Sequence, residues 1–192
     1  MASKKLLPVI FFESQTDWES WLEDNQTVSP GVWVKMAKKA SGIVSLDYPQ
    51  ALESALCYGW IDGQKNAFDD TYWLQHFTQR RPRSNWSKIN CEKVTQLIAQ
   101  GRMKPGGMKV VEEAKRDGRW EAAYAPQRDI AIPADFLERL AENPVARAFF
   151  DALDKRNRYI ILYEIENAKK QETRVKRIEK FIVLLNAEKK LI

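Results

Sequence analysis

The sequence contains few of the residues that build disulfides and metal centres. Its 192 residues include two cysteines, Cys57 and Cys91, and a single histidine, His76. The cysteines lie apart without a CxxC spacing, whereas a structural zinc site takes four cysteine or histidine ligands. We therefore expect no metal site and no cofactor, and we interpret both thiols as packing residues of a reducing compartment.

Long apolar runs are also absent. The first residues, MASKKLLPVIFFES, contain two lysines and a short apolar run that Pro8 interrupts, and no small-residue cleavage site follows. No stretch approaches the roughly 18 apolar residues that a membrane-spanning helix needs. The sequence therefore predicts a protein without a membrane span, and we expect it in the cytoplasm.

The signature motifs of common enzyme classes are missing as well. The sequence has no G-x-S-x-G elbow, no Walker loop, no Rossmann glycine pattern and no HExxH. Catalysis by residues scattered along the chain leaves no such motif, so Asp62 and His76 are kept as catalytic candidates for acid–base chemistry. A lone histidine without a marked partner is more often structural, and we favour a non-catalytic protein.

Positive charge is concentrated in the middle of the chain. Between Gln79 and Arg119, eleven lysines and arginines face four acidic residues, which gives a net charge of +7. The whole chain carries +5, so the remaining residues sum to −2. This field attracts an anionic partner, such as a small anion or nucleic acid, and it repels cationic peptides.

The stretch from Gly59 to Asn90 combines aromatic, polar and basic side chains at high density. Its part RRPRSNWSK offers guanidinium groups that bind phosphate or carboxylate, followed by the free N–H groups of a helix start. The alternative is a set of surface charges paired with acidic residues of neighbouring helices. The earlier part, GWIDGQ, offers an aromatic surface beside polar groups for stacking a ring. A buried tryptophan whose neighbours satisfy backbone groups at a strand end is the interpretation we favour there, and Asp62 opposite Arg81 would also form a stable ion pair.

The sequence therefore predicts one ligand-binding site in this stretch, and an anion is its expected ligand. Its members are Trp60, Asp62, Gln64, Arg80, Arg81, Ser84, Trp86 and Lys88.

The first half of the chain predicts a small antiparallel sheet with helices. Residues 9–12 and 32–37 indicate strands, and residues 60–79 indicate a hairpin that turns at Asp69-Asp70-Thr71 rather than at Asp62-Gly63. Helices are expected to begin at Thr16 and after Asp47. The register predicts two shared strand faces, one with Trp60, Asp62, Gln64 and Asn66 and one with Tyr72, Leu74, His76 and Thr78.

The second half predicts helices only, and the fold class is therefore α+β. We expect an α+β domain at residues 1–125 and a helical C-terminal region at residues 126–192 packed on it. One helix is capped by Asn90, and another opens at Gly106-Gly107, where the glycines serve a flexible turn or, less favourably, the approach of a ligand. The inward positions include Phe136, Leu137 and Leu140 in one later helix and Val175, Ile178, Ile182 and Leu185 in the last.

Several motifs along the chain are long enough to be specific. They are GWIDGQ, FTQRRPRSNWSKIN and LIAQGRM in the middle, and RYIILYEIENAKKQETRVKRIEKFIVLL near the end. Together they resemble the YdeI/OmpD-associated, or bacteriocin-protection, family of small bacterial proteins over Val32 to Leu185. The resemblance implies a part in tolerance of bacteriocins or cationic antimicrobial peptides, and it implies no catalytic residues and no ligand.

Three functions follow from these patterns. The favoured one is a non-catalytic cytoplasmic stress- or antimicrobial-tolerance protein that binds an anionic ligand through RRPRSNWSK. The alternatives are a nucleic-acid-binding module, whose affinity falls steeply with salt, and an enzyme acting on a small phosphorylated or carboxylated substrate. The C-terminal helices also offer a surface for a protein partner or a homodimer.

Overall fold

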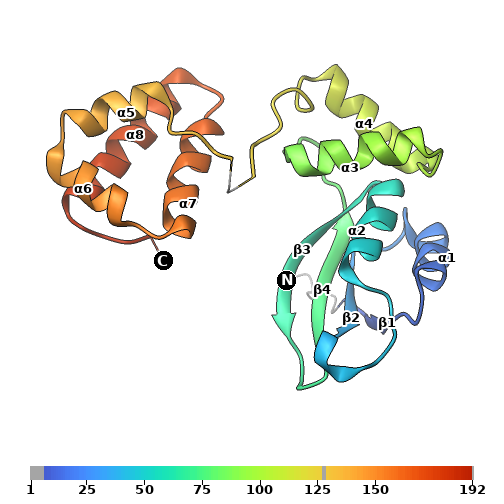
Figure 1. Ribbon diagram of the computed structural model, residues 1–192. Coiled ribbons are helices and arrows are strands. Elements are labelled where there is room, and N and C mark those ends of the chain that lie inside the picture. The colour runs from blue at the N-terminus through green and yellow to red at the C-terminus, as the bar shows by residue number, and fades with distance from the viewer. Residues whose placement is uncertain (1–6, 127–128, 192) are drawn as a thin grey trace, which may run out of the picture. The chain divides into compact units, whose positions relative to one another are not determined.

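The computed structural model describes residues 7–126 and 129–191 (Figure 1). The chain divides into two compact units. The first takes the residues up to Trp86 together with Asn90–Ala122, and the second takes Ser87–Ile89 and the residues from Ala123 onward. The predicted α+β class is confirmed, because the first unit holds a sheet with helices and the second is helical. The packing of one unit on the other stays a prediction.

The first unit is built on a four-stranded sheet in the order β1-β2-β4-β3. Its strands are β1 (Val9–Phe11), β2 (Val32–Ala37), β3 (Trp60–Ala67) and β4 (Tyr72–Gln79). β4 pairs antiparallel with β2 and β3, as expected, while β1 pairs parallel with β2 and makes the sheet mixed. The β3–β4 hairpin turns at residues 68–71, so the alternative turn at Asp62-Gly63 is wrong.

A β-bulge changes the face that the second half of β3 presents. Asp62 lies opposite Phe77 and Lys65 lies opposite Gln75, so two residues of β3 oppose the single residue between Phe77 and Gln75. The extra residue reverses the alternation of side chains. The predicted shared face of Trp60, Asp62, Gln64 and Asn66 is therefore wrong beyond Asp62, because Lys65 and Ala67 continue that face instead.

The core of the first unit lies between one sheet face and two helices, α1 (Gln15–Asn25) and α2 (Tyr48–Cys57). Trp18 of α1 is fully buried, its ring lies 5.4 Å from that of Phe77, and its indole N–H donates to the Ala51 carbonyl at 3.0 Å. Ser14 caps α1 in a capping box with Asp17, two residues before the predicted start. That box supplies an acceptor for the Asp17 N–H, which Thr16 does not.

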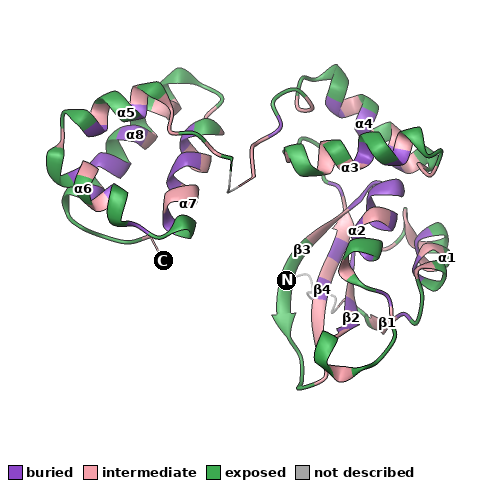
Figure 2. Ribbon diagram, in the orientation of Figure 1, coloured by how far each residue is buried: buried purple, intermediate pink, exposed green. Residues whose placement is uncertain are grey.

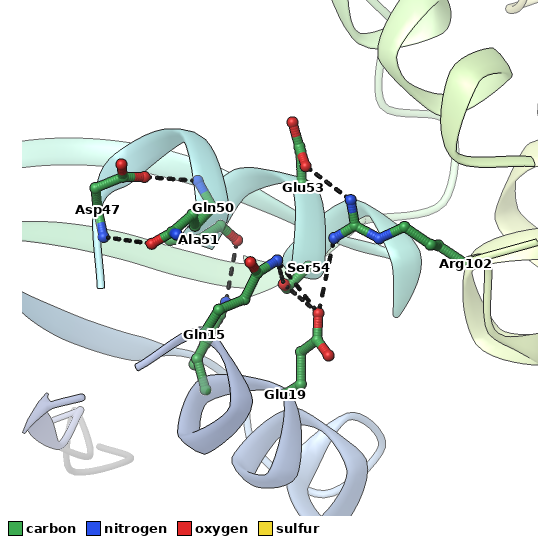
Figure 3. A network of polar contacts seen from close by, with 9 residues as sticks. Gln15, Glu19, Asp47, Gln50, Ala51, Glu53, Ser54 and Arg102 are labelled. Atoms are coloured by element: carbon green, nitrogen blue, oxygen red, sulfur yellow. Dashed lines mark hydrogen bonds and ion pairs between the residues drawn. The ribbon is translucent and has the colours of Figure 1, made fainter. Parts of the chain in front are cut away.

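A polar network joins α1, α2 and the segment that follows α3 (Figure 3). The Ser54 hydroxyl is fully buried, donates to Glu19 at 2.7 Å and accepts from Gln15 at 2.8 Å. Arg102 donates to Glu53 at 2.9 Å and lies 3.9 Å from Glu19. The network satisfies the buried hydroxyl and ties three segments of the first unit together.

Two helices complete the first unit, α3 (Lys88–Ala99) and α4 (Pro105–Arg116), and a short 3-10 helix, η1 (Lys39–Ser41), follows β2. α3 begins two residues before the predicted Asn90 cap. Gly106 and Gly107 lie in the first turn of α4 against the end of α2. A Cβ on Gly107 would lie 2.1 Å from the Cys57 carbonyl oxygen. These glycines therefore allow two backbones to approach, and neither a flexible turn nor a ligand accounts for them.

The second unit packs four helices around an apolar core (Figure 2). They are α5 (Ala134–Ala141), α6 (Pro144–Ala152), α7 (Lys155–Glu166) and α8 (Gln171–Asn186). Ile178, Ile182 and Leu185 are buried as predicted. Leu137 and Val175 were predicted inward but are 40% and 47% exposed, because the buried stripe of each helix is narrower than the apolar pattern.

An ion pair links three helices of the second unit. Arg174 of α8 donates to both carboxylate oxygens of Asp135 in α5, at 2.6 and 2.9 Å, and to the Ile165 carbonyl of α7 at 3.1 Å. These hydrogen bonds lower the pKa of Asp135. Arg174, which lies in the motif near the end of the chain, therefore has a structural role in this unit.

Among the described residues, no helix combines the length and the apolar character that crossing a membrane requires.

Candidate anion-binding site

The candidate site begins where β4 ends. The Arg80 N–H donates to the Gly59 carbonyl at 3.0 Å, and its guanidinium carbon lies 3.7 Å from the centre of the Trp86 ring. An Nη2–H of Arg80 donates to the Asn85 carbonyl at 3.1 Å, and the residue is only 9% exposed. Arginine stacks on aromatic faces and stays charged when buried. The fold therefore holds one guanidinium group in a fixed orientation.

A tight turn follows at Arg81–Ser84. The Ser84 N–H donates to the Arg81 carbonyl at 3.1 Å, and Pro82 and Arg83 occupy the two central positions. Arg83 has a φ of 65°. Proline at the first central position and a positive φ at the second define a type II turn. The turn leaves Arg81 and Arg83 exposed, with Pro82 between them in the sequence.

The arginines converge on a small pocket of about 40 Å³. Arg119, which follows α4, donates to both carboxylate oxygens of Asp117, at 2.8 and 2.9 Å, and to the Ser84 carbonyl at 3.0 Å. Arg81 makes no ion pair with any residue that the structure describes. The lining residues include three arginines and one glutamate: Arg80, Arg81, Pro82, Val110, Glu113 and Arg119. Its net charge is therefore positive.

Two buried donors of the same segment lack an acceptor among the described residues. They are the Ser84 hydroxyl and the indole N–H of Trp86. Trp86 is 1% exposed and lies between Arg80 and the Trp120 ring, whose centre is 5.0 Å away. A buried donor without an acceptor costs about 1–3 kcal/mol, a cost that a bound acceptor or water removes.

The residues predicted from GWIDGQ lie elsewhere. Trp60 is fully buried, and its indole N–H donates to the Gln26 carbonyl at 3.2 Å. Its ring packs edge-on against Trp21 at 5.6 Å. These contacts favour the interpretation of Trp60 as a core residue. Gln64 is exposed in the bulge, and neither residue lines the pocket.

Lys88 is the first residue of α3 and is exposed. Its N–H donates to the Tyr124 carbonyl at 3.0 Å, and both residues belong to the second compact unit. Its part in the site, like that of the other predicted ligand-binding residues, stays a prediction.

The two catalytic candidates point to opposite faces of the sheet. Asp62 lies opposite Phe77 in the β3–β4 pairing, whereas His76 is the next residue along β4. Asp62 accepts a hydrogen bond from the Tyr48 hydroxyl at 2.9 Å, and among the described residues it forms no ion pair with Arg81. Burial and this carboxylate raise the pKa of Tyr48. Residues on opposite faces cannot act on one substrate atom, so the pair forms no acid–base dyad.

His76 is half-buried in the sheet. Its ring lies 5.0 Å from that of Trp33, and Cβ atoms added to Gly31 and Gly63 would each lie 2.9 Å from one of its ring nitrogens. Burial, and then the positive charge of Arg81, lower the pKa of His76 below its ordinary value of 6.5. The neutral imidazole is therefore the form that the folded state favours.

This shift predicts how stability depends on pH. Below pH 6.5 the unfolded chain takes up a proton that folded His76 resists, so the free energy of unfolding should fall as the pH falls from 7 toward 5.5. Urea unfolding at several pH values measures this slope. His76→Gln should flatten it, and Arg81→Ala should weaken it. An unchanged slope in His76→Gln would assign the pH dependence to the carboxylates.

Sequence reasoning missed the residues that α4 and its C-terminal end bring to the pocket. Val110 and Glu113 lie on α4, and Arg119 lies just beyond it. A usable signal was present, because Gly118 marks the end of α4 and places Arg119 at the start of the next segment. No local motif, however, connects this segment with Arg80 and Arg81.

The two cysteines are free, and the structure describes no group of three or more histidine, cysteine or acidic residues that could hold a metal ion. Burial raises the pKa of Cys57 and of Cys91 to about 11. Both thiols are therefore protonated at neutral pH and are poor nucleophiles.

Comparisons with known proteins assign the two parts of the chain separately. Residues 10–110 match the sequence model described as "Domain of unknown function (DUF8412)". Residues 129–188 match the model described as "Bacteriocin-protection, YdeI or OmpD-Associated". The resemblance is thus confirmed for the C-terminal part, whereas GWIDGQ and RRPRSNWSKIN lie within the first match. Searches of curated proteins and of solved structures found no match. The chain belongs to the family of the DUF8412 domain over more than half its length, and its C-terminal part is a bacteriocin-protection, YdeI or OmpD-associated domain.

Proposed function

We propose that this protein binds a small anion in the pocket of Arg80, Arg81 and Arg119, and that binding serves a non-catalytic role in antimicrobial or stress tolerance in the cytoplasm. One observation carries the proposal. Three arginines from two separate segments line a single pocket of about 40 Å³, together with one glutamate. Guanidinium groups bind phosphate and carboxylate through paired charge-assisted hydrogen bonds.

The arginines differ in how they support this proposal. Arg80 is stacked on Trp86, and Arg119 is held by Asp117, so both are oriented before an anion arrives. Arg81 is exposed and makes no ion pair within the described residues, so its guanidinium group is available to a ligand. Preorganised groups lose little conformational entropy on binding, which favours affinity for a small ligand.

The tolerance role rests on the family match of residues 129–188. Direct capture of cationic peptides is disfavoured, because residues 79–119 carry a net charge of +7. An anionic metabolite bound inside the cell is a better fit to that charge. The two free thiols suit a reducing compartment and support the proposed cytoplasmic location.

Arg81→Ala should weaken anion binding about tenfold or more, since a hydrogen bond to a charged group contributes about 1.5–3 kcal/mol. A low-salt thermal-shift screen with phosphate, nucleotides, sugar phosphates and dicarboxylates would identify the ligand, and calorimetry would give its affinity. Arg116→Gln is the matched control. Arg116 is exposed at the end of α4 in the same basic stretch, and it does not line the pocket.

Two results would contradict the proposal. One is the absence of a shift with any anion at low salt. The other is an equal loss of affinity in Arg81→Ala and Arg116→Gln, which would assign binding to the general positive field. Tight binding of a short RNA with a steep salt dependence would instead favour the nucleic-acid alternative.

A further inference from the structure

The turn at Arg81–Ser84 places an arginine where the backbone favours glycine. Arg83 has a φ of 65° at the second central position of the turn. A side chain with a Cβ is strained in this left-handed region, and glycine, asparagine or aspartate normally occupies such a position. Among the described non-glycine residues, the only other positive φ belongs to Glu188, in the segment after α8. Strain of this kind concentrates at ligand-binding positions.

The arginine at this position gains no contact that offsets the strain. Arg83 is exposed and forms no hydrogen bond or ion pair with any described residue. Its side chain neither lines the pocket nor packs on an aromatic ring of the described chain. The contacts of Arg83 with the described residues therefore give it no stabilising role in the fold. The positive charge itself, next to the pocket-lining Arg81 and Pro82, is what the residue supplies.

The size of the pocket determines how Arg83 can take part. A volume of about 40 Å³ is about three times the roughly 10–15 Å³ that holds a single water molecule, so the pocket has room for one small anionic group. An anion that contacts Arg83, which is not in the lining, must therefore be a second group outside the pocket. The proline turn holds Arg81 and Arg83 two residues apart, and both side chains are exposed.

We infer that Arg83 is a second binding residue of this site and that the ligand carries two linked anionic phosphate groups, one in the pocket and one at the turn. This inference rests on the proposed function, because it needs the pocket to hold the first group. The ligand is then a diphosphate, either as free pyrophosphate or as the diphosphate of a nucleotide. Glu113 in the lining limits the positive charge of the pocket and favours a single group there.

Calorimetry at low salt with inorganic phosphate, pyrophosphate and ADP tests the inference. The wild-type protein should bind pyrophosphate about tenfold more tightly than phosphate, which corresponds to one added charge-assisted contact. Arg83→Gly and Arg83→Asn should lose this preference and keep their affinity for phosphate. Glycine and asparagine both tolerate a positive φ, so neither variant should melt below the wild-type temperature. The melting temperature of Arg83→Gly should rise by up to about 2–4 °C.

The controls separate the inference from the proposed function. Arg116→Gln removes one charge nearby in the basic stretch, and it should keep the preference for pyrophosphate. The inference is overturned if the wild-type protein binds phosphate and pyrophosphate equally, if Arg83→Gly keeps the preference for pyrophosphate, or if Arg116→Gln loses that preference as fully.

Phosphate binding that Arg81→Ala abolishes would still support the proposed function in those cases. No binding of either probe to the wild-type protein would overturn both. Tighter binding of ADP than of pyrophosphate would identify the nucleotide form, and equal binding of the two would identify free pyrophosphate.

Discussion

Gly107→Ala is expected to destabilise the first unit by about 3 kcal/mol or more. The added Cβ would lie 2.1 Å from the Cys57 carbonyl oxygen and 2.9 Å from that of Leu56, both of which are backbone atoms. Backbone cannot rotate out of the way, so α4 has to move away from α2. The sign of the change in unfolding free energy is informative, because a glycine-to-alanine change in an ordinary helix stabilises the helix by about 0.5–1 kcal/mol.

The displacement of α4 should also reach the candidate site. Val110 and Glu113, one and two turns further along α4, line the pocket. Urea unfolding followed by tryptophan fluorescence measures the stability, and phosphate affinity reports the pocket. Gly101→Ala is the matched control, because Gly101 has a φ of 67° and no atom within 4 Å of its added Cβ. It should cost about 1–2 kcal/mol and leave binding unchanged. A neutral or stabilising Gly107→Ala would show that α4 does not pack this closely on α2.

Much of the first unit could be predicted from its pattern of residues. The strand-forming residues of Val32–Ala37 and the two strands around Asp69-Asp70-Thr71 are local signals, and the structure confirms both strand predictions. The bulge in β3 could not be predicted in the same way. Its extra residue is fixed by the partner strand, where the Gln75 amide donates to the Gly63 and Gln64 carbonyls at 3.0 and 3.3 Å.

The residues of the candidate site also divide into those that local sequence signals predict and those that only the packing of the fold brings in. Arg80 and Arg81 are adjacent in the sequence, so their cluster was visible without a structure. Arg119 reaches the same pocket only because α4 packs on α2 at Gly106 and Gly107. Trp60 shows the opposite case. Its sequence surroundings suit a stacking surface as well as a buried tryptophan, and its full burial and the packing of Trp21 on its ring favour a core residue.

Trp86→Ala is expected to cost about 3–5 kcal/mol, the range for removing a large buried aromatic side chain. Trp86 is 1% exposed, and its ring supports the Arg80 guanidinium group on one side and contacts Trp120. Its loss leaves a cavity and frees Arg80 from its fixed orientation. Affinity for an anion should therefore fall together with stability, even though Trp86 itself does not line the pocket.

Trp86→Phe separates the two contributions of this side chain. Phenylalanine keeps an aromatic face under Arg80 and removes an indole N–H that has no acceptor among the described residues. The smaller ring leaves a small cavity, but losing an unsatisfied buried donor recovers about 1–3 kcal/mol. The unfolding free energy of Trp86→Phe should therefore stay within about 1 kcal/mol of wild type in urea unfolding without ligand. A cost close to that of Trp86→Ala would show that the indole N–H has a partner in the free protein. If instead Trp86→Phe keeps its stability but loses anion affinity, the smaller ring no longer holds Arg80 in its binding orientation.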